Sequence, residues 1–153
     1  MDIKISKINQ ITFKPFGEIL EPSEELNPEV SEDGVFKFYV TFKEEARGWQ
    51  IGFLDQVGKK VEKLECHPNT SEVFVPLSGD AVLILAIDPQ DTISAFRLEK
   101  PIVLYKKVWH GIISLTDRSR MLIVENPDVI DEYYQLNVPI NNNNLILVDE
   151  LGK

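Results

Sequence analysis

The sequence predicts an all-β protein, either a sandwich or a closed barrel, and two observations support this prediction. Short runs rich in Val, Ile, Phe and Tyr recur along most of the 153 residues, separated by Gly, Pro, Asn and Asp, and this is the pattern of many short strands. Only two segments have a weak helical character. Because a chain of this length fits one domain, we expect a single barrel over residues 1–153.

The expected strands are Ile3–Ile8, Gly17–Leu20, Val35–Phe42, Trp49–Leu54, Val61–His67, Val73–Leu77, Ala81–Ile87, Ser94–Arg97, Ile102–Tyr105, Ile112–Leu115 and Met121–Val124. A turn is expected near Thr12–Phe16. A short helix is expected over Asp128–Tyr134, because this segment opens after a proline with acidic residues in its first turn. The apolar segment Leu145–Val148 should add a strand either to its own sheet or to that of a neighbouring subunit.

Charge and composition exclude several classes of protein. With 16 Lys and Arg against 25 Asp and Glu, the net charge of −9 opposes binding to nucleic acid phosphates. The longest apolar run, Ala81–Ile87, is too short to cross a membrane, and the first residues lack the features of a secretory signal. We therefore expect a cytoplasmic protein. The segment Glu21–Asp33 has six acids and no base, so we expect an exposed loop there.

The chain has one cysteine, Cys66, and two histidines, His67 and His110. A single cysteine excludes a disulfide framework and any all-thiolate metal site. If Pro68–Ser71 forms a four-residue hairpin loop, His67 and Glu72 face each other across two paired strands. Any metal site would then use histidine and carboxylate ligands.

Strand alternation places Glu65 on the same face as His67 and turns Cys66 to the other face. If the barrel brings the strand after Trp109 beside this hairpin, His110 completes a site of two histidines and a carboxylate. We predict that His67, Glu72 and His110 bind a divalent metal ion, Ni²⁺, Mn²⁺, Zn²⁺ or Fe²⁺, because this donor set suits all four.

The spacing of these residues resembles the first motif of the cupin superfamily. Glu65-Cys-His67, four residues, Glu72, six residues and Gly79 follow that motif, with Glu65 in the place of its first histidine. His110 represents the second motif. This resemblance implies a cupin-type double-stranded β-helix, a jelly-roll barrel, with one or two short helices.

Within the superfamily, three blocks of sequence resemble the ureidoglycolate lyase family. They are Phe13–Glu21, Glu65–Gly79 and Val103–His110. The chain differs from that family at Glu72, where Gln is usual, and at Gly111, where a second His is usual. The resemblance implies a metal-assisted lyase that cleaves a C–N bond of ureidoglycolate and releases glyoxylate and urea.

That reaction assigns further roles. Glu72 or Glu65 would be the base that takes the hydroxyl proton, and Tyr105 or a returning water would protonate the leaving nitrogen. Arg97, Lys106 or Lys107 would bind the substrate carboxylate, and Trp109 would line the substrate site.

Two other classes of function stay open on the sequence. In the first, the chain would be a different cupin enzyme, an isomerase or a dioxygenase that acts on an anionic metabolite. In the second, it would be a non-catalytic binding module. For an enzyme the expected partner is a small anionic metabolite, whereas a binding module would use the barrel cavity to hold a ligand or a partner. Because open sheet edges favour association, we also expect a homodimer in which Ile3–Ile8 or Leu145–Val148 is the edge or exchanged strand.

Overall fold

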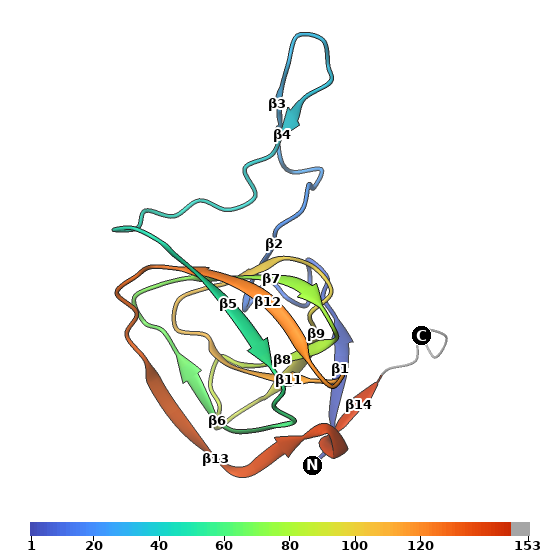
Figure 1. The fold of residues 1–153 in the computed structure, drawn as a ribbon, viewed down its shortest axis with the longest axis vertical. Coiled ribbons are helices and arrows are strands. Elements are labelled where there is room, and N and C mark those ends of the chain that lie inside the picture. Colours follow the sequence, from blue (N-terminus) through green and yellow to red (C-terminus); the bar gives the residue numbers. More distant parts are fainter. Residues whose placement is uncertain (148–153) are drawn as a thin grey trace.

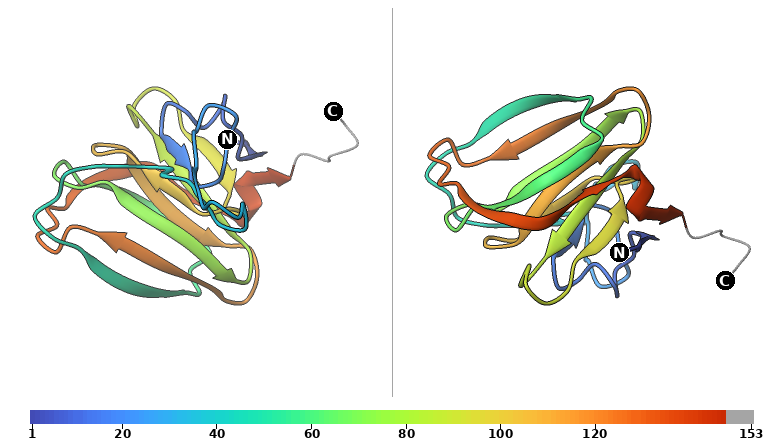
Figure 2. Two further views of the ribbon diagram at one scale, coloured as in Figure 1. Left: turned by 90° about the horizontal axis from the view of Figure 1, so that it is seen from above. Right: turned by 90° about the horizontal axis from the view of Figure 1, so that it is seen from below.

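Two curled β-sheets enclose a shared interior in the computed structural model, which describes residues 1–147 (Figure 1). The larger sheet has seven strands in the order β13 (Glu132–Asn141), β6 (Lys60–Cys66), β11 (Trp109–Ser114), β8 (Ala81–Ala86), β9 (Ser94–Arg97), β1 (Ile3–Lys7) and β14 (Leu145–Leu147). The smaller has five, β2 (Gly17–Ile19), β10 (Ile102–Leu104), β7 (Glu72–Ser78), β12 (Ser119–Glu125) and β5 (Gln50–Gln56). Views from above and below show the two layers facing each other (Figure 2). The prediction of an all-β, cupin-type barrel is confirmed.

The apolar run of β8 explains why this strand lies in the middle of the larger sheet. All six of its side chains are buried, and they alternate between two apolar clusters. Ala81, Leu83 and Leu85 pack inside the barrel, whereas Val82, Ile84 and Ala86 pack in the second cluster. A strand that is buried on both faces has a continuous apolar sequence rather than an alternating one.

The structure corrects one of the two predictions made for the non-strand segments. No helix covers Asp128–Tyr134; instead β13 begins at Glu132 and pairs with β6, because that pairing buries Leu136 and Ile140 in the second cluster. The only helix among residues 1–147 is a 3-10 helix, η1 (Asn142–Asn144). The turn expected near Thr12–Phe16 is present, since Phe16 and Gly17 both donate backbone hydrogen bonds to Phe13.

The expected strand Val35–Phe42 is wrong in extent. Only β4 (Lys37–Phe38) forms, and it pairs with β3 (Glu29–Val30) in a hairpin that stands away from the barrel (Figure 1). The acidic segment around β3 has no fully buried residue, in agreement with the prediction of an exposed region.

Of the two segments predicted as edge strands, one lies inside the sheet and the other lies at its edge. The strand β1 lies between β9 and β14 and is not an edge. The strand β14 pairs with β1 in parallel and forms one edge of its own sheet. Val148, the last residue of the predicted segment, lies outside the described residues. No helix of the described chain is long and apolar enough to cross a membrane.

Gly79, the last residue of the motif, is required by the turn between β7 and β8. Its φ is +72°, and a Cβ added there would overlap the backbone oxygen of Arg118 and lie 2.9 Å from Cα of Ser119. Gly34 has the same φ of +72°, but an added Cβ would meet nothing within 4 Å. A comparison of alanine substitutions at the two glycines therefore distinguishes the cost of a positive φ from the added cost of steric overlap.

We expect Gly34→Ala to cost about 1–2 kcal/mol, the usual penalty of a left-handed non-glycine residue. Gly79→Ala should cost about 4 kcal/mol or more, because the backbone at residues 118–119 must also move. Urea denaturation followed by circular dichroism measures both losses. Equal losses for the two variants would contradict the steric argument.

Candidate metal centre

The structure brings His67, Glu72 and His110 together, although not by the predicted hairpin. Strands β6 and β7 belong to different sheets and do not pair. The segment 67–71 carries the chain from one sheet to the other, and His67 is its first residue. Even so, Nε2 of His67 lies 3.2 Å from Oε2 of Glu72. The prediction of their proximity is confirmed, and the hairpin that was used to derive it is wrong.

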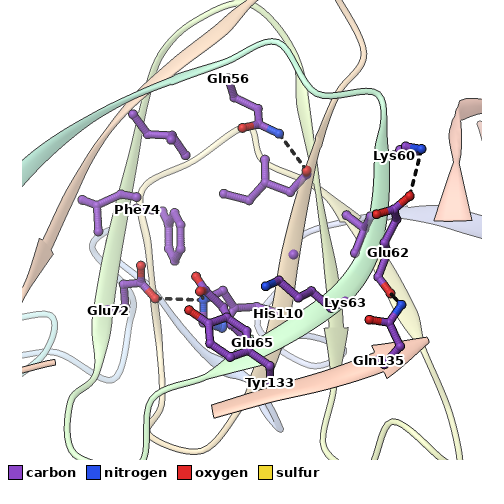
Figure 3. A pocket seen from close by; sticks show the side chains of 15 residues that line it. Gln56, Lys60, Glu62, Lys63, Glu65, Glu72, Phe74, His110, Tyr133 and Gln135 are labelled. Atoms are coloured by element: carbon purple, nitrogen blue, oxygen red, sulfur yellow. Dashed lines mark hydrogen bonds and ion pairs between the residues drawn. The ribbon is translucent and has the colours of Figure 1, made fainter. Parts of the chain in front are cut away.

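His110 comes from the larger sheet, where it lies opposite Glu65 in the register of β11 and β6. Its Nε2 is 3.1 Å from Oε2 of Glu72 and 3.3 Å from Oε1 of Glu65. The side chains of Glu72 and His110 are only 7% and 4% exposed, whereas that of Glu65 is 40% exposed. Glu65 is therefore the accessible member of this group, and Figure 3 shows it beside His110.

Each histidine has its other ring nitrogen held by an oxygen. Nδ1 of His67 lies 3.0 Å from Oδ1 of Asp131 and 3.3 Å from the carbonyl oxygen of Ile130, and Nδ1 of His110 lies 3.1 Å from the carbonyl oxygen of Val108. Since a carbonyl oxygen only accepts, Nδ1 carries the proton and Nε2 of each neutral ring is free to bind a metal.

The electrostatics of the cluster favour charged side chains. Burial opposes ionisation of Glu72, but the two histidines outweigh it and lower the pKa to about 2. Burial likewise opposes protonation of His110, but Glu65 and Glu72 raise its pKa to about 10. The pKa of His67 is also raised, since Glu72 outweighs the effect of burial. In the absence of a metal the cluster thus holds protons that a cation would displace.

Two further observations fit a bound cation. Within the described chain, Oε2 of Glu72 and Nε2 of His110 are buried and have no hydrogen-bond partner of acceptable geometry, although they lie within ion-pair distance. In addition, two sets of residues have donor atoms within 4.8 Å of one another, Glu65, His67 and His110, and His67, Glu72 and Glu125. Two imidazoles with carboxylates match a divalent metal of the first transition row.

A cavity of about 620 Å³ opens onto this cluster. Glu65, Glu72 and His110 line one end, and Phe74, Leu54 and Ile123 supply an apolar wall. Such a volume accommodates a small metabolite.

Four predicted substrate and proton-transfer residues lie elsewhere. The hydroxyl of Tyr105 donates to Oε1 of Glu18 at 2.9 Å and lines a second cavity. Arg97 pairs with Asp80 and Glu99. Lys107 is exposed, and its backbone N–H donates to the carbonyl of His67.

Trp109 belongs to the second apolar cluster and packs against Tyr134, with ring centroids 6.2 Å apart. Lys106, the other lysine considered, pairs with Glu44 at 3.1 Å. The structure therefore does not bring any of these residues to the cluster.

Sequence reasoning missed three polar residues of the centre. Glu125 lies opposite Glu72 in the register of β12 and β7, and its pKa is raised by burial and by the charge of Glu72. Asp131 contacts His67 from the loop before β13 and had no signal in the sequence. Lys63 lines the cavity two positions before Glu65, so strand alternation was the signal that indicated it.

Asp131 is expected to position His67 for metal binding. Asp131→Ala should weaken metal affinity about 10- to 100-fold, the usual effect of removing the partner of a ligating histidine. Asp128→Ala is the matched control, because Asp128 lies in the same loop and, in the part of the chain that the structure describes, its carboxylate pairs only with the exposed Arg47, at 3.8 Å. The substitution keeps the backbone carbonyl of residue 128, which accepts a hydrogen bond from Asn69. Isothermal titration with Mn²⁺ measures the metal affinity of both variants. Equal affinities would contradict the role of Asp131 in positioning His67.

A cupin-type β-barrel with a buried histidine–carboxylate cluster at the end of a cavity is the class of protein that the fold and the site define. The sequence profile of the family described as ureidoglycolate lyase matches residues 1–142. The chain therefore belongs to the ureidoglycolate lyase family, and the prediction of an enzyme of this type is confirmed.

The relatives are distant. Ureidoglycolate lyase 2 of Rhizobium meliloti (strain 1021) is 22% identical over 139 residues, which cover 80% of this chain and 85% of that protein. The sugar 3,4-ketoisomerase of Thermoanaerobacterium thermosaccharolyticum has a TM-score of 0.47 at 14% identity, with 83% of this chain and 86% of that one covered. Oxalate decarboxylase of Bacillus subtilis has a TM-score of 0.43 at 19% identity over 58% of this chain, which spans 24% of that protein.

Proposed function

We propose that this protein is a metal-dependent lyase that cleaves ureidoglycolate into glyoxylate and urea. The observation that carries the proposal is the buried cluster of His67, Glu72 and His110 at the end of a cavity that is also lined by the more accessible Glu65. Membership of the ureidoglycolate lyase family supports the choice of substrate. Its cytoplasmic location stays a prediction from the sequence.

Burial separates the roles of the two carboxylates. Glu72 is buried between the histidines and is suited to hold a divalent cation with them. When bound, that cation would supply Lewis-acid stabilisation of negative charge on the substrate oxygens. Glu65 is more exposed, and its pKa is lowered by the contact with His110, so it is ionised at neutral pH and able to accept a proton.

One carboxylate is sufficient for the proton transfers of this reaction. Glu65 takes the proton from the hydroxyl of the substrate as its carbon–oxygen bond becomes a carbonyl and the carbon–nitrogen bond breaks. The same proton then goes from Glu65 to the leaving urea nitrogen, so that no proton is gained or lost overall. This route needs no contribution from Tyr105, whose hydroxyl is engaged by Glu18.

An assay of the purified protein with ureidoglycolate and Mn²⁺ or Ni²⁺ tests the proposal. Glyoxylate should form above the non-enzymatic background. Glu65→Gln should lower kcat by about 10²- to 10⁴-fold, the range for a general acid–base group, while metal affinity changes far less. Absence of glyoxylate above background would overturn the proposed reaction.

The donor set also suits a non-haem iron oxygenase, which uses two histidines and one carboxylate. This second candidate predicts iron in the purified protein and oxygen consumption with an anionic substrate. A redox-inactive metal in an active preparation would exclude it.

We also propose that the chain forms a homodimer, but through a different edge from those predicted. Strand β5 is an edge of the smaller sheet, and Trp49, Ile51 and Phe53 on or beside it are each more than half exposed. Exposed apolar residues on an open edge favour pairing with an identical edge. Size-exclusion chromatography with light scattering should give a dimer for the unmodified protein and a monomer for Phe53→Glu; a monomer for both would overturn this.

A further inference from the structure

An exposed lysine that lines the cavity has no anionic partner among residues 1–147. Lys63 lies on β6 between Val61 and Glu65, on the face that lines the cavity. Its Nζ lies 4.2 Å from the centroid of the Tyr133 ring, and its side chain extends toward the middle of the cavity in Figure 3. A cation over an aromatic face is held in position without being neutralised.

The other lysine that lines this cavity is already paired. Lys60, which also lines the cavity, lies 2.9 Å from Glu62. Arg97 and Lys106, which were expected to bind substrate, pair with acids of their own. Among residues 1–147, no carboxylate lies within ion-pair distance of Lys63.

The surroundings of Lys63 are otherwise acidic. The cluster contains Glu65, Glu72 and Glu125, and the chain as a whole has a net charge of −9. An anionic molecule that enters this cavity meets repulsion from these carboxylates unless a cation offsets it. Lys63 is placed to offset this repulsion. It lies two residues before Glu65, which corresponds to about 6.6 Å along the strand.

We propose that Lys63 binds the carboxylate of the substrate and selects small α-hydroxy carboxylates over their neutral analogues. The inference rests on the proposed function for the identity of the substrate, but not for the anion site. Lys63 lines the same cavity as Glu65, Glu72 and His110, so a molecule of this class would place its carboxylate at Lys63 and its hydroxyl toward the histidine–carboxylate cluster. Lys63 thus takes the role that the sequence assigned to Arg97 or Lys107.

The test uses glycolate and glycolamide, in which a neutral amide of nearly the same shape replaces the carboxylate. Isothermal titration measures the affinity of both for the Mn²⁺-loaded protein. The unmodified protein should prefer glycolate by about tenfold or more, the worth of a hydrogen bond between charged groups. Lys63→Met should remove most of this preference while glycolamide still binds, and Lys63→Arg should keep part of it.

Lys60→Met is the matched control, since it removes a cavity-lining ammonium that is already paired, and the preference should stay within about twofold of the original. Circular dichroism checks that each variant folds. An unchanged preference in Lys63→Met, or no preference in the unmodified protein, overturns the inference. Turnover of ureidoglycolate measured on the same samples separates this from a failure of the proposed reaction, because glycolate selection is observable without turnover.

Discussion

His110→Ala is expected to abolish activity and to lower metal affinity by more than about 10³-fold, beyond the effect of losing an outer partner of a ligand. His110 is 4% exposed and contacts both Glu72 and Glu65 through the nitrogen that would bind the metal. No other histidine of the chain can replace it, since the sequence has only two. Equilibrium titration with Mn²⁺ and the glyoxylate assay measure the two losses.

Loss of folding must be separated from loss of the ligand. Removing His110 leaves Glu72 buried without that partner, and breaking a buried ion pair costs about 3–5 kcal/mol. Among the described residues, Glu72 keeps only His67 as a partner in this variant, so the double variant His110→Ala with Glu72→Gln, which removes the buried charge, should recover part of the stability without recovering metal binding. Trp109→Phe is the control on the neighbouring position, because Trp109 packs against Tyr134; it should keep metal affinity. Full metal content in His110→Ala would overturn the assigned site.

The residues of the metal centre could be predicted from the sequence because their motif spacing is preserved, whichever way the chain turns between them. The turn signals of Pro68–Ser71 are the same for a hairpin and for a crossing between sheets, so the hairpin was the simpler interpretation. The crossing depends on which strands pair with β6 and β7, and that is decided by contacts between distant segments. Proximity was therefore predictable and topology was not.

The substrate-binding residues were less predictable for a related reason. Tyr105 was assigned to the site as a proton donor for the reaction that the family resemblance implies. However, β10 ends at Leu104, and the turn that follows carries the chain to the other sheet. Asp131 contacts His67 across 63 intervening residues, and its loop was interpreted as a helix. Of the missed residues, only Lys63 could have been predicted from the sequence, since alternation along β6 places it on the same face as Glu65.

The charge state of the metal-free cluster makes stability and metal affinity depend on pH in opposite ways. His110, with a pKa raised from 6.5 to about 10, contributes stability that is complete below pH 6.5 and lost as the pH rises to about 10. Glu72, with a pKa lowered from 4.5 to about 2, contributes stability that is complete above pH 4.5 and lost as the pH falls to about 2. The His110–Glu72 pair thus stabilises the metal-free protein most between pH 4.5 and pH 6.5, where both contributions are complete.

Metal binding at pH 7 should therefore release close to one proton from His110 and a further fraction from His67, because a metal ligates only the neutral ring. Isothermal titration in buffers of different ionisation enthalpy counts these protons. Between about pH 6 and pH 8, affinity should rise at least tenfold per pH unit, as the loss of one proton requires. Glu72→Gln should release fewer protons, because the carboxylate that raises both histidine pKa values is gone. If the unmodified protein releases no protons at pH 7, the histidines are neutral before the metal arrives and the assigned charge state is wrong.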